Sequence, residues 1–174
     1  MRILWVVFAF WVTLSPATSA AFGDISNESL YASFITNIIK YSSFPNLQTE
    51  DAPLVVALSG PESLIKTVTS ALDGATLRHR KVQVRIFHKL PPAGANVVFV
   101  GQQNEGYERD LIASCSSVKA LCISDSPAFA ALGGAVQIAV KDGRIRFRIN
   151  REGIHPLQIE LSSRVMVLAD DVLN

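Results

Sequence analysis

The chain lacks the motifs from which most enzyme sites are recognised. It has only 3 histidines, which are scattered along the sequence, and only 2 cysteines. It contains no HExxH metal-binding motif, no GxSxG nucleophile elbow and no P-loop for phosphates. The sequence therefore assigns no nucleophile, metal site or cofactor-binding loop. It favours a protein without catalytic activity and without a cofactor.

An excess of charge of one sign is also missing once the N-terminus is set aside. Residues 1–20 have the three parts of a secretory signal peptide: a positive start at Arg2, an apolar run at 3–14 and small residues at 18–20. Cleavage after Ala20 is favoured over an uncleaved anchor, because a membrane span needs about 20 apolar residues. Without Arg2, the 16 basic residues become 15 and balance the 15 acidic ones. This balance argues against nucleic-acid binding and gives no polybasic membrane patch.

The two cysteines, Cys115 and Cys122, lie close together in the segment CSSVKALC. Export to an oxidising compartment and an even count favour one intramolecular disulfide. Two buried free thiols are the alternative, since free cysteine is often a core residue. A metal site is disfavoured because no second cysteine pair or histidine cluster accompanies them.

Helical and extended patterns alternate along the rest of the chain, after a loose segment at 21–27. The first helix starts from a cap at Ser26 or Asn27 and ends near Tyr41. Further helices are predicted at 61–72, 104–115, 126–132 and 162–173. Strands are predicted at 54–59, 82–87, 96–101, 118–124, 135–140 and 144–150, the last two joined as a hairpin. This order predicts one α/β domain over 28–174 with a largely parallel sheet.

Three predicted strand–helix loops have the position of a ligand site. They contribute Ser59 and Gly60, then Gln102, then Asp125. Ligands of open α/β sheets bind beyond the carboxyl ends of the strands, and helix N-termini attract anions. Ordinary helix caps have the same composition, however, and they are the more common explanation.

Arginines alternate with apolar residues in the last predicted strand, RIRFRIN at 144–150. One face carries Arg144, Arg146 and Arg148. The other face carries Ile145, Phe147 and Ile149. We expect the arginines to be exposed near a sheet edge and the apolar face to be buried, because three unpaired arginines cannot lie in a core. The arginines are either a solvated surface or a partner surface, and a second basic run, RHRK at 78–81, has the same two interpretations.

Several segments, taken in order, resemble the YfiR-like family of exported bacterial proteins. They are SLYASFITNIIKYSSFP, VALSGPESL, NVVFVGQ, ALCISDSPAFAALGGAVQIAV, GRIRFRIN and IELSSRVMVLA. No single segment is specific, but the ordered set spans most of the mature chain. The family usually has an acidic residue where Arg148 stands, so this surface departs from the family pattern.

The resemblance implies a three-layer α/β/α sandwich in the periplasm, without a catalytic site. Family members repress an inner-membrane diguanylate cyclase by binding its periplasmic region, and they tend to form homodimers. The spacing of Cys115 and Cys122 is similar to that of the family's C-terminal disulfide pair. A second pair, found in some members, has no counterpart here, which puts redox switching in doubt.

Three functions therefore remain to be compared. The first is a periplasmic regulator that represses a cyclase through protein–protein contact, and the resemblance favours it. The second is a periplasmic small-ligand sensor that uses the loops at 59–63, 101–106 and 124–127. The third is an exported enzyme. Its candidate catalytic residue is His155 or Asp125, and no motif supports either.

Overall fold

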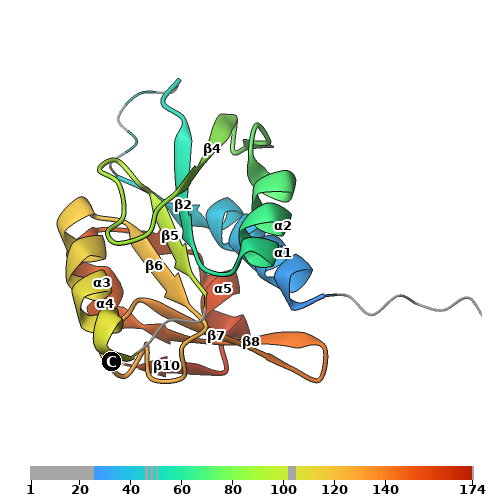
Figure 1. The fold of residues 1–174 in the computed structure, drawn as a ribbon. Helices are drawn as coiled ribbons and strands as arrows, with labels where there is room; N and C mark the ends of the chain where they lie inside the picture. Colours follow the sequence, from blue (N-terminus) through green and yellow to red (C-terminus); the bar gives the residue numbers. More distant parts are fainter. Residues whose placement is uncertain (1–25, 46, 48, 50, 102–104, 174) are drawn as a thin grey trace, which may run out of the picture.

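The computed structural model describes residues 26–45, 47, 49, 51–101 and 105–173 (Figure 1). The predicted signal peptide, residues 21–25 and Gln102 lie outside the described residues. The described part has a mixed α/β fold around one large sheet and a second, two-stranded sheet.

The large sheet has 8 strands in the order β10-β8-β7-β6-β5-β2-β4-β3. In chain order these are β2 (Leu54–Ser59), β3 (Thr76–Leu77), β4 (Arg80–Ile86), β5 (Val97–Val100), β6 (Leu121–Ser124), β7 (Val136–Lys141), β8 (Arg144–Asn150) and β10 (Asp171–Leu173). Strands β4, β2, β5, β6 and β7 are parallel, whereas β8 is antiparallel to β7 and β3 is antiparallel to β4. The predicted sheet, largely parallel with an antiparallel hairpin, is confirmed.

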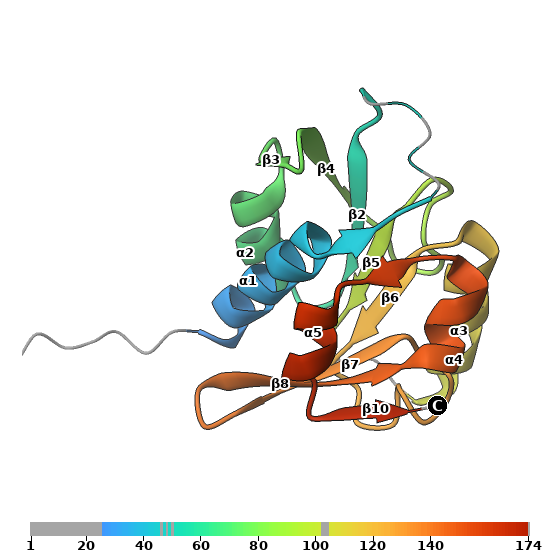
Figure 2. The same cartoon turned by 180° about the vertical axis from the view of Figure 1, so that it is seen from behind.

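Helices cover both faces of this sheet (Figures 1 and 2). On one face, α1 (Asn27–Lys40) and α2 (Glu62–Leu72) pack on alternate residues of the central strands, such as Val56 and Phe99. On the other face, α3 (Glu105–Val118) packs on the intervening residues, such as Ala57 and Val98. The central strands are therefore buried on both sides, which explains their unbroken apolar sequences. The three layers expected from the resemblance are present.

The remaining elements lie around the C-terminal end of β8. They are α4 (Arg151–Ile154), a 3₁₀ turn (His155–Leu157), β9 (Glu160–Leu161) and α5 (Ser163–Leu168). Strand β9 pairs with β1 (Ser42–Ser43), which follows α1, and this pair forms the small second sheet. Ile154, Leu157 and Val165 join the core beneath α1, so these short elements extend the α1 layer.

The predicted helix at 126–132 is wrong, because this segment forms a series of turns. Its backbone is used for tertiary bonds: the carbonyl of Ala130 accepts a 2.8 Å hydrogen bond from the side chain of Asn150. The Phe129 ring is fully buried and lies against Gly134, where a Cβ atom would come within 2.3 Å of it. The chain therefore turns tightly around this ring instead of continuing as a helix.

The predicted helix at 162–173 is correct only in its first half. Helix α5 ends at Leu168, and the chain then becomes extended as β10 beside β8. Similarly, the strand predicted at 118–124 starts only at Leu121, because α3 continues to Val118 and the chain reverses at Lys119 with a φ of 55°. In both places a sheet neighbour distant in sequence decides where the helix ends.

Candidate functional site

The three arginines of β8 lie on the face of the sheet that α3 leaves uncovered. Arg144, Arg146 and Arg148 are all exposed. In the described part of the chain, no residue of β7 or β8 belongs to the core beneath α3, so the helix does not reach this hairpin. The expected exposure of the arginines is confirmed.

Two of these arginines form ion pairs with the C-terminal segment. The Arg146 guanidinium lies 3.1 Å from the Asp170 carboxylate, and the Arg148 guanidinium lies 4.0 Å from that of Asp171. The arginine side chains remain 54% and 55% exposed, so each pair contributes little to stability. Arg144 has no ion pair among the described residues.

The opposite face of β8 is buried only towards its end. Ile149 is fully buried, whereas Ile145 and Phe147 are half-buried. The Phe147 ring packs against the Phe34 ring of α1, with ring centres 5.1 Å apart. The expectation of a fully buried apolar face was therefore wrong for Ile145 and Phe147. The hairpin tip projects beyond the helices that would cover it (Figure 2).

Cys115 and Cys122 form a disulfide between the last turns of α3 and strand β6. Their Cα atoms are 5.9 Å apart, and each residue is 2% exposed. The bond spans the reversal at Lys119 and joins α3 to the centre of the sheet. This position suits a structural bridge that solvent does not reach.

The strand-end loops meet at the carboxyl ends of the parallel strands. Ser59 is buried at the end of β2, and Gly60 follows it with a φ of 149°. A Cβ atom at Gly60 would lie 3.1 Å from the Gly101 carbonyl oxygen, so the two loops are in close contact. Asp125, at the end of β6, accepts a 3.2 Å hydrogen bond from the Tyr31 hydroxyl of α1. The fourth predicted loop residue, Gln102, lies outside the described residues.

Tyr31 keeps its proton at this contact. Burial, together with the negative charge of Asp125, raises the pKa of the Tyr31 phenol from 10.0 to about 12. The phenol is therefore a hydrogen-bond donor at neutral pH, and it ties α1 to the end of β6. This contact has a structural role, because it joins a helix to the end of a strand.

The second basic run also makes structural contacts. Arg78 and His79 form the tight turn between β3 and β4, with φ values of 50° and 64°. The Arg80 guanidinium donates hydrogen bonds to the backbone carbonyls of Thr49 and Ala52, the latter at 3.0 Å. This arginine holds the loop before β2 against the edge of the sheet.

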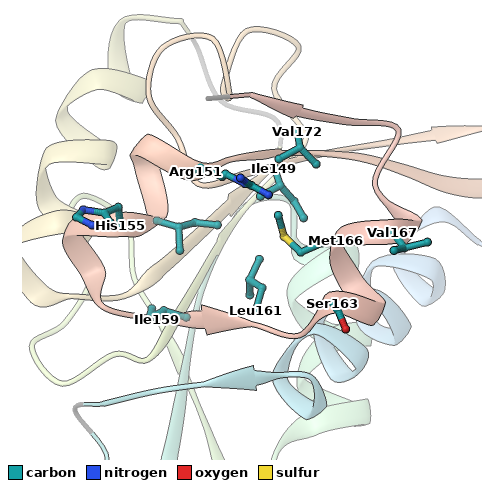
Figure 3. Close-up of a pocket in the computed structure, with 10 residues that line it drawn as sticks. Ile149, Arg151, His155, Ile159, Leu161, Ser163, Met166, Val167 and Val172 are labelled. Atoms are coloured by element: carbon teal, nitrogen blue, oxygen red, sulfur yellow. The ribbon is translucent and has the colours of Figure 1, made fainter.

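An apolar groove that sequence analysis did not predict lies beneath the C-terminal elements (Figure 3). It has a volume of about 670 Å³, and its rim includes Arg151, His155 and Ser163. Its apolar lining consists of Ile149, Ile154, Ile159, Leu161, Met166, Val167 and Val172. The side chains come from β8, α4, the 3₁₀ turn, β9 and the residue before it, α5 and β10, and the figure shows them around one central space.

Helix α5 adds exposed apolar residues beside this groove. Val167 is 84% exposed and Leu168 is 73% exposed. The apolar run VMVL at 165–168 could have indicated this exposed surface, because four consecutive residues of a helix cannot all face one core. Apolar residues that stay exposed together often mark an interaction surface.

A comparison with protein families identifies the chain. The family model described as YfiR/HmsC-like (DUF4154) matches residues 28–170. The chain belongs to the YfiR/HmsC-like family. A search of curated proteins found no match. The matched region extends from α1 to Asp170 and contains the arginine face, the disulfide and most of the groove.

None of the described helices of this YfiR/HmsC-like protein is both long and apolar enough to cross a membrane. Within the described residues, no three histidine, cysteine or acidic side chains are grouped so that they could hold a metal ion. The candidate site is the surface around β8, with the arginine face on one side of the sheet, the groove on the other side and β10 at the edge between them.

Proposed function

We propose that this protein is a periplasmic, non-catalytic regulator that represses an inner-membrane diguanylate cyclase by binding its periplasmic region. The family match over residues 28–170 carries this proposal. YfiR-like proteins are regulators in cyclic di-GMP signalling. Cyclic di-GMP is made in the cytoplasm, so an exported regulator must act through a partner that crosses the membrane.

Export is part of the proposal. Residues 1–20 act as the signal peptide, with cleavage after Ala20, and residues 28–174 form the exported domain. The sequence pattern of a positive start, an apolar run and small residues supports this. N-terminal sequencing of the protein from a periplasmic extract checks it, and a chain that still begins at Met1 contradicts it.

The surface around β8 supplies the contact in this proposal. A complex of this kind buries about 800 Å² on each partner and combines a desolvated apolar centre with a polar rim. The groove beside Val167 and Leu168 is apolar. The three arginines lie on the opposite face of β8, so a partner that contacts both must pass around the β8–β10 edge of the sheet. The regulator needs only to bind one state of the cyclase better than the other. A difference of about 5.5 kcal/mol would change the enzyme from almost fully active to almost fully inactive.

Gene deletion with complementation tests the function. Deleting the gene should raise cellular cyclic di-GMP, and the wild-type gene should restore the original level. The Arg146→Glu variant should restore it poorly and should recover less cyclase in a pull-down, while its circular dichroism and melting temperature stay near those of the wild type. Arg85→Glu, on the far side of the sheet, is the matched control and should behave as wild type. An unchanged cyclic di-GMP level after deletion would contradict the proposal.

A periplasmic small-ligand sensor is the second candidate function. The groove favours it, because ligand pockets of about 300–1,000 Å³ are mostly apolar and carry a few polar groups. Arg151 and His155 provide such groups at the rim. The two functions differ in the pull-down: a sensor that acts without this regulation would recover no membrane signalling protein.

A further inference from the structure

The C-terminal strand β10 occupies part of the outer edge of β8. It pairs in parallel with β8, with Asp171 opposite Arg148 and Leu173 opposite Asn150. Just before it, the Asp170 amide donates a 2.9 Å hydrogen bond to the Phe147 carbonyl. Val172 lines the apolar groove. Residues 171–173 thus act as a short extended ligand of β8.

Only a few exposed interactions hold β10 in place. The strand has 3 residues, and the two ion pairs that Asp170 and Asp171 form with Arg146 and Arg148 remain open to solvent. Exposed ion pairs contribute little to stability, and segments with few buried contacts open most readily. Strand β10 is therefore easier to detach than any central strand of the sheet.

The other half of the β8 edge is open. In the described part of the chain, pairing of β8 with β10 covers only Arg148–Asn150 of its residues. Because the Phe147 carbonyl points outward, the two-residue period of a strand directs the backbone groups of Ile145 outward as well. Figure 2 shows the β7–β8 hairpin extending past β10. A longer strand could pair along the whole of β8.

We propose that β8 is a strand-addition site, and that β10 is the chain's own occupant, which a partner segment displaces. The seated segment indicates the chemistry of its replacement: one acidic residue at a bend, as at Asp170, then a short extended stretch of one acidic and two apolar residues, as in β10. Its carboxylates would pair with the exposed arginines, its first apolar side chain would enter the groove, and its backbone would bond the edge of β8. This inference rests on the proposed function and specifies how the partner is recognised.

Arg144 gives a partner segment an advantage over β10. It lies at the open end of the same face and has no ion pair among the described residues. A segment that starts further towards the hairpin tip gains this arginine and the free backbone groups near Ile145. Against this, β10 is tethered, so it competes at an effective concentration on the order of millimolar.

A peptide titration of the full chain tests the proposal. The probe is the synthetic peptide Leu-Ala-Asp-Asp-Val-Leu-Asn, which copies residues 168–174, followed by two-dimensional NMR. Val172→Asp should release the chain's own strand, because a carboxylate does not fit the apolar groove. This variant should bind the peptide at least about tenfold more tightly than the wild type, with amide shifts concentrated at 144–150.

A second variant and matched controls ensure that the conclusion does not depend on the Val172→Asp substitution alone. Asp170→Lys with Asp171→Lys breaks both ion pairs and should also bind the peptide more tightly than the wild type. A peptide with lysines in place of both aspartates should bind neither variant. Adding Arg146→Glu and Arg148→Glu to Val172→Asp should abolish binding, whereas adding Arg85→Glu should not.

Three results would overturn the proposal. The first is that the wild type and the two variants designed to release β10, both folded, bind the peptide equally well, or that none of the three proteins binds it. The second is binding of the lysine peptide. The third is dimer formation by the opened variants without peptide, which would assign the edge to a second copy of the chain. If the peptide fails but gene deletion still raises cyclic di-GMP, the repressor function stands and only strand addition is rejected.

Discussion

At the scale of single residues, the contact between Tyr31 and Asp125 is the clearest electrostatic feature of the protein. The phenol donates to the carboxylate at 3.2 Å, and burial followed by the Asp125 charge raises the pKa of Tyr31 to about 12. A group that keeps its proton longer in the folded state stabilises the fold below its unfolded pKa. This stabilisation is lost as the pH rises from about 10 to about 12.

We therefore predict that Asp125→Asn lowers the pKa of Tyr31. Absorbance at the tyrosinate band during a pH titration measures it, with the Tyr31→Phe protein subtracted to isolate Tyr31. Asp110→Asn is the control, because burial and then the Asp110 charge raise the pKa of a different phenol, that of Tyr107. The assignment fails if Asp110→Asn moves the Tyr31 signal as far as Asp125→Asn does.

At the same scale, the disulfide should stabilise the domain without acting as an accessible switch. A loop closed over a separation of 7 residues contributes roughly 2–3 kcal/mol in the chain-entropy model. Replacing both Cys115 and Cys122 with serine should lower the free energy of unfolding by about this amount, measured by urea denaturation.

Labelling of thiols checks the pairing itself. Unfolded but unreduced protein should contain no reactive thiol. Native protein in mild reductant should react slowly, because both cysteines are buried. Two reactive thiols without reduction would contradict the bond, and fast native reduction would contradict its structural role.

At the scale of elements, β8 combines three environments within one strand. Ile149 is fully buried, Phe147 is half-buried against Phe34, and Arg146 is exposed. The cost of truncation should follow this order. We expect a loss of about 2–5 kcal/mol for Ile149→Ala, about 2 kcal/mol for Phe147→Ala and less than about 1 kcal/mol for Arg146→Ala. Urea denaturation measures all three, and an equal loss from Arg146→Ala and Ile149→Ala would contradict the orientation of β8.

The elements also show where local sequence patterns fail. The segment at 126–132 begins with Ser-Pro, a common start of a helix, yet it forms turns around Phe129. The segment at 162–173 has a helical pattern, yet it changes to a strand after Leu168. In each case a long-range contact outweighs local propensity: the Asn150 hydrogen bond in the first and the β8 edge in the second.

At the scale of the whole molecule, the sheet separates two differently covered faces. Helices α1 and α2 cover one face, and α3 covers only the centre of the other. The β7–β8 hairpin therefore keeps an open, arginine-bearing surface, and the short C-terminal elements surround an apolar groove on the opposite face of the sheet. In the proposed regulator, the cyclase would contact this part of the molecule around the β8–β10 edge.

The sequence by itself determined most of the alternation of helices and strands, the largely parallel sheet and the family. These follow from local periodicity and from the order of short segments along the chain. It also favoured a bond between Cys115 and Cys122, the only two cysteines, but left two free thiols as the alternative.

Only the tertiary structure decided how the C-terminal part is used. Arg146 and Asp170 are 24 residues apart, and their ion pair exists because β10 returns to β8. The groove likewise collects side chains from six separate elements, none of which is apolar enough to predict it alone. Local patterns report which residues share a face of one element, whereas a groove and a displaceable edge strand depend on which elements meet.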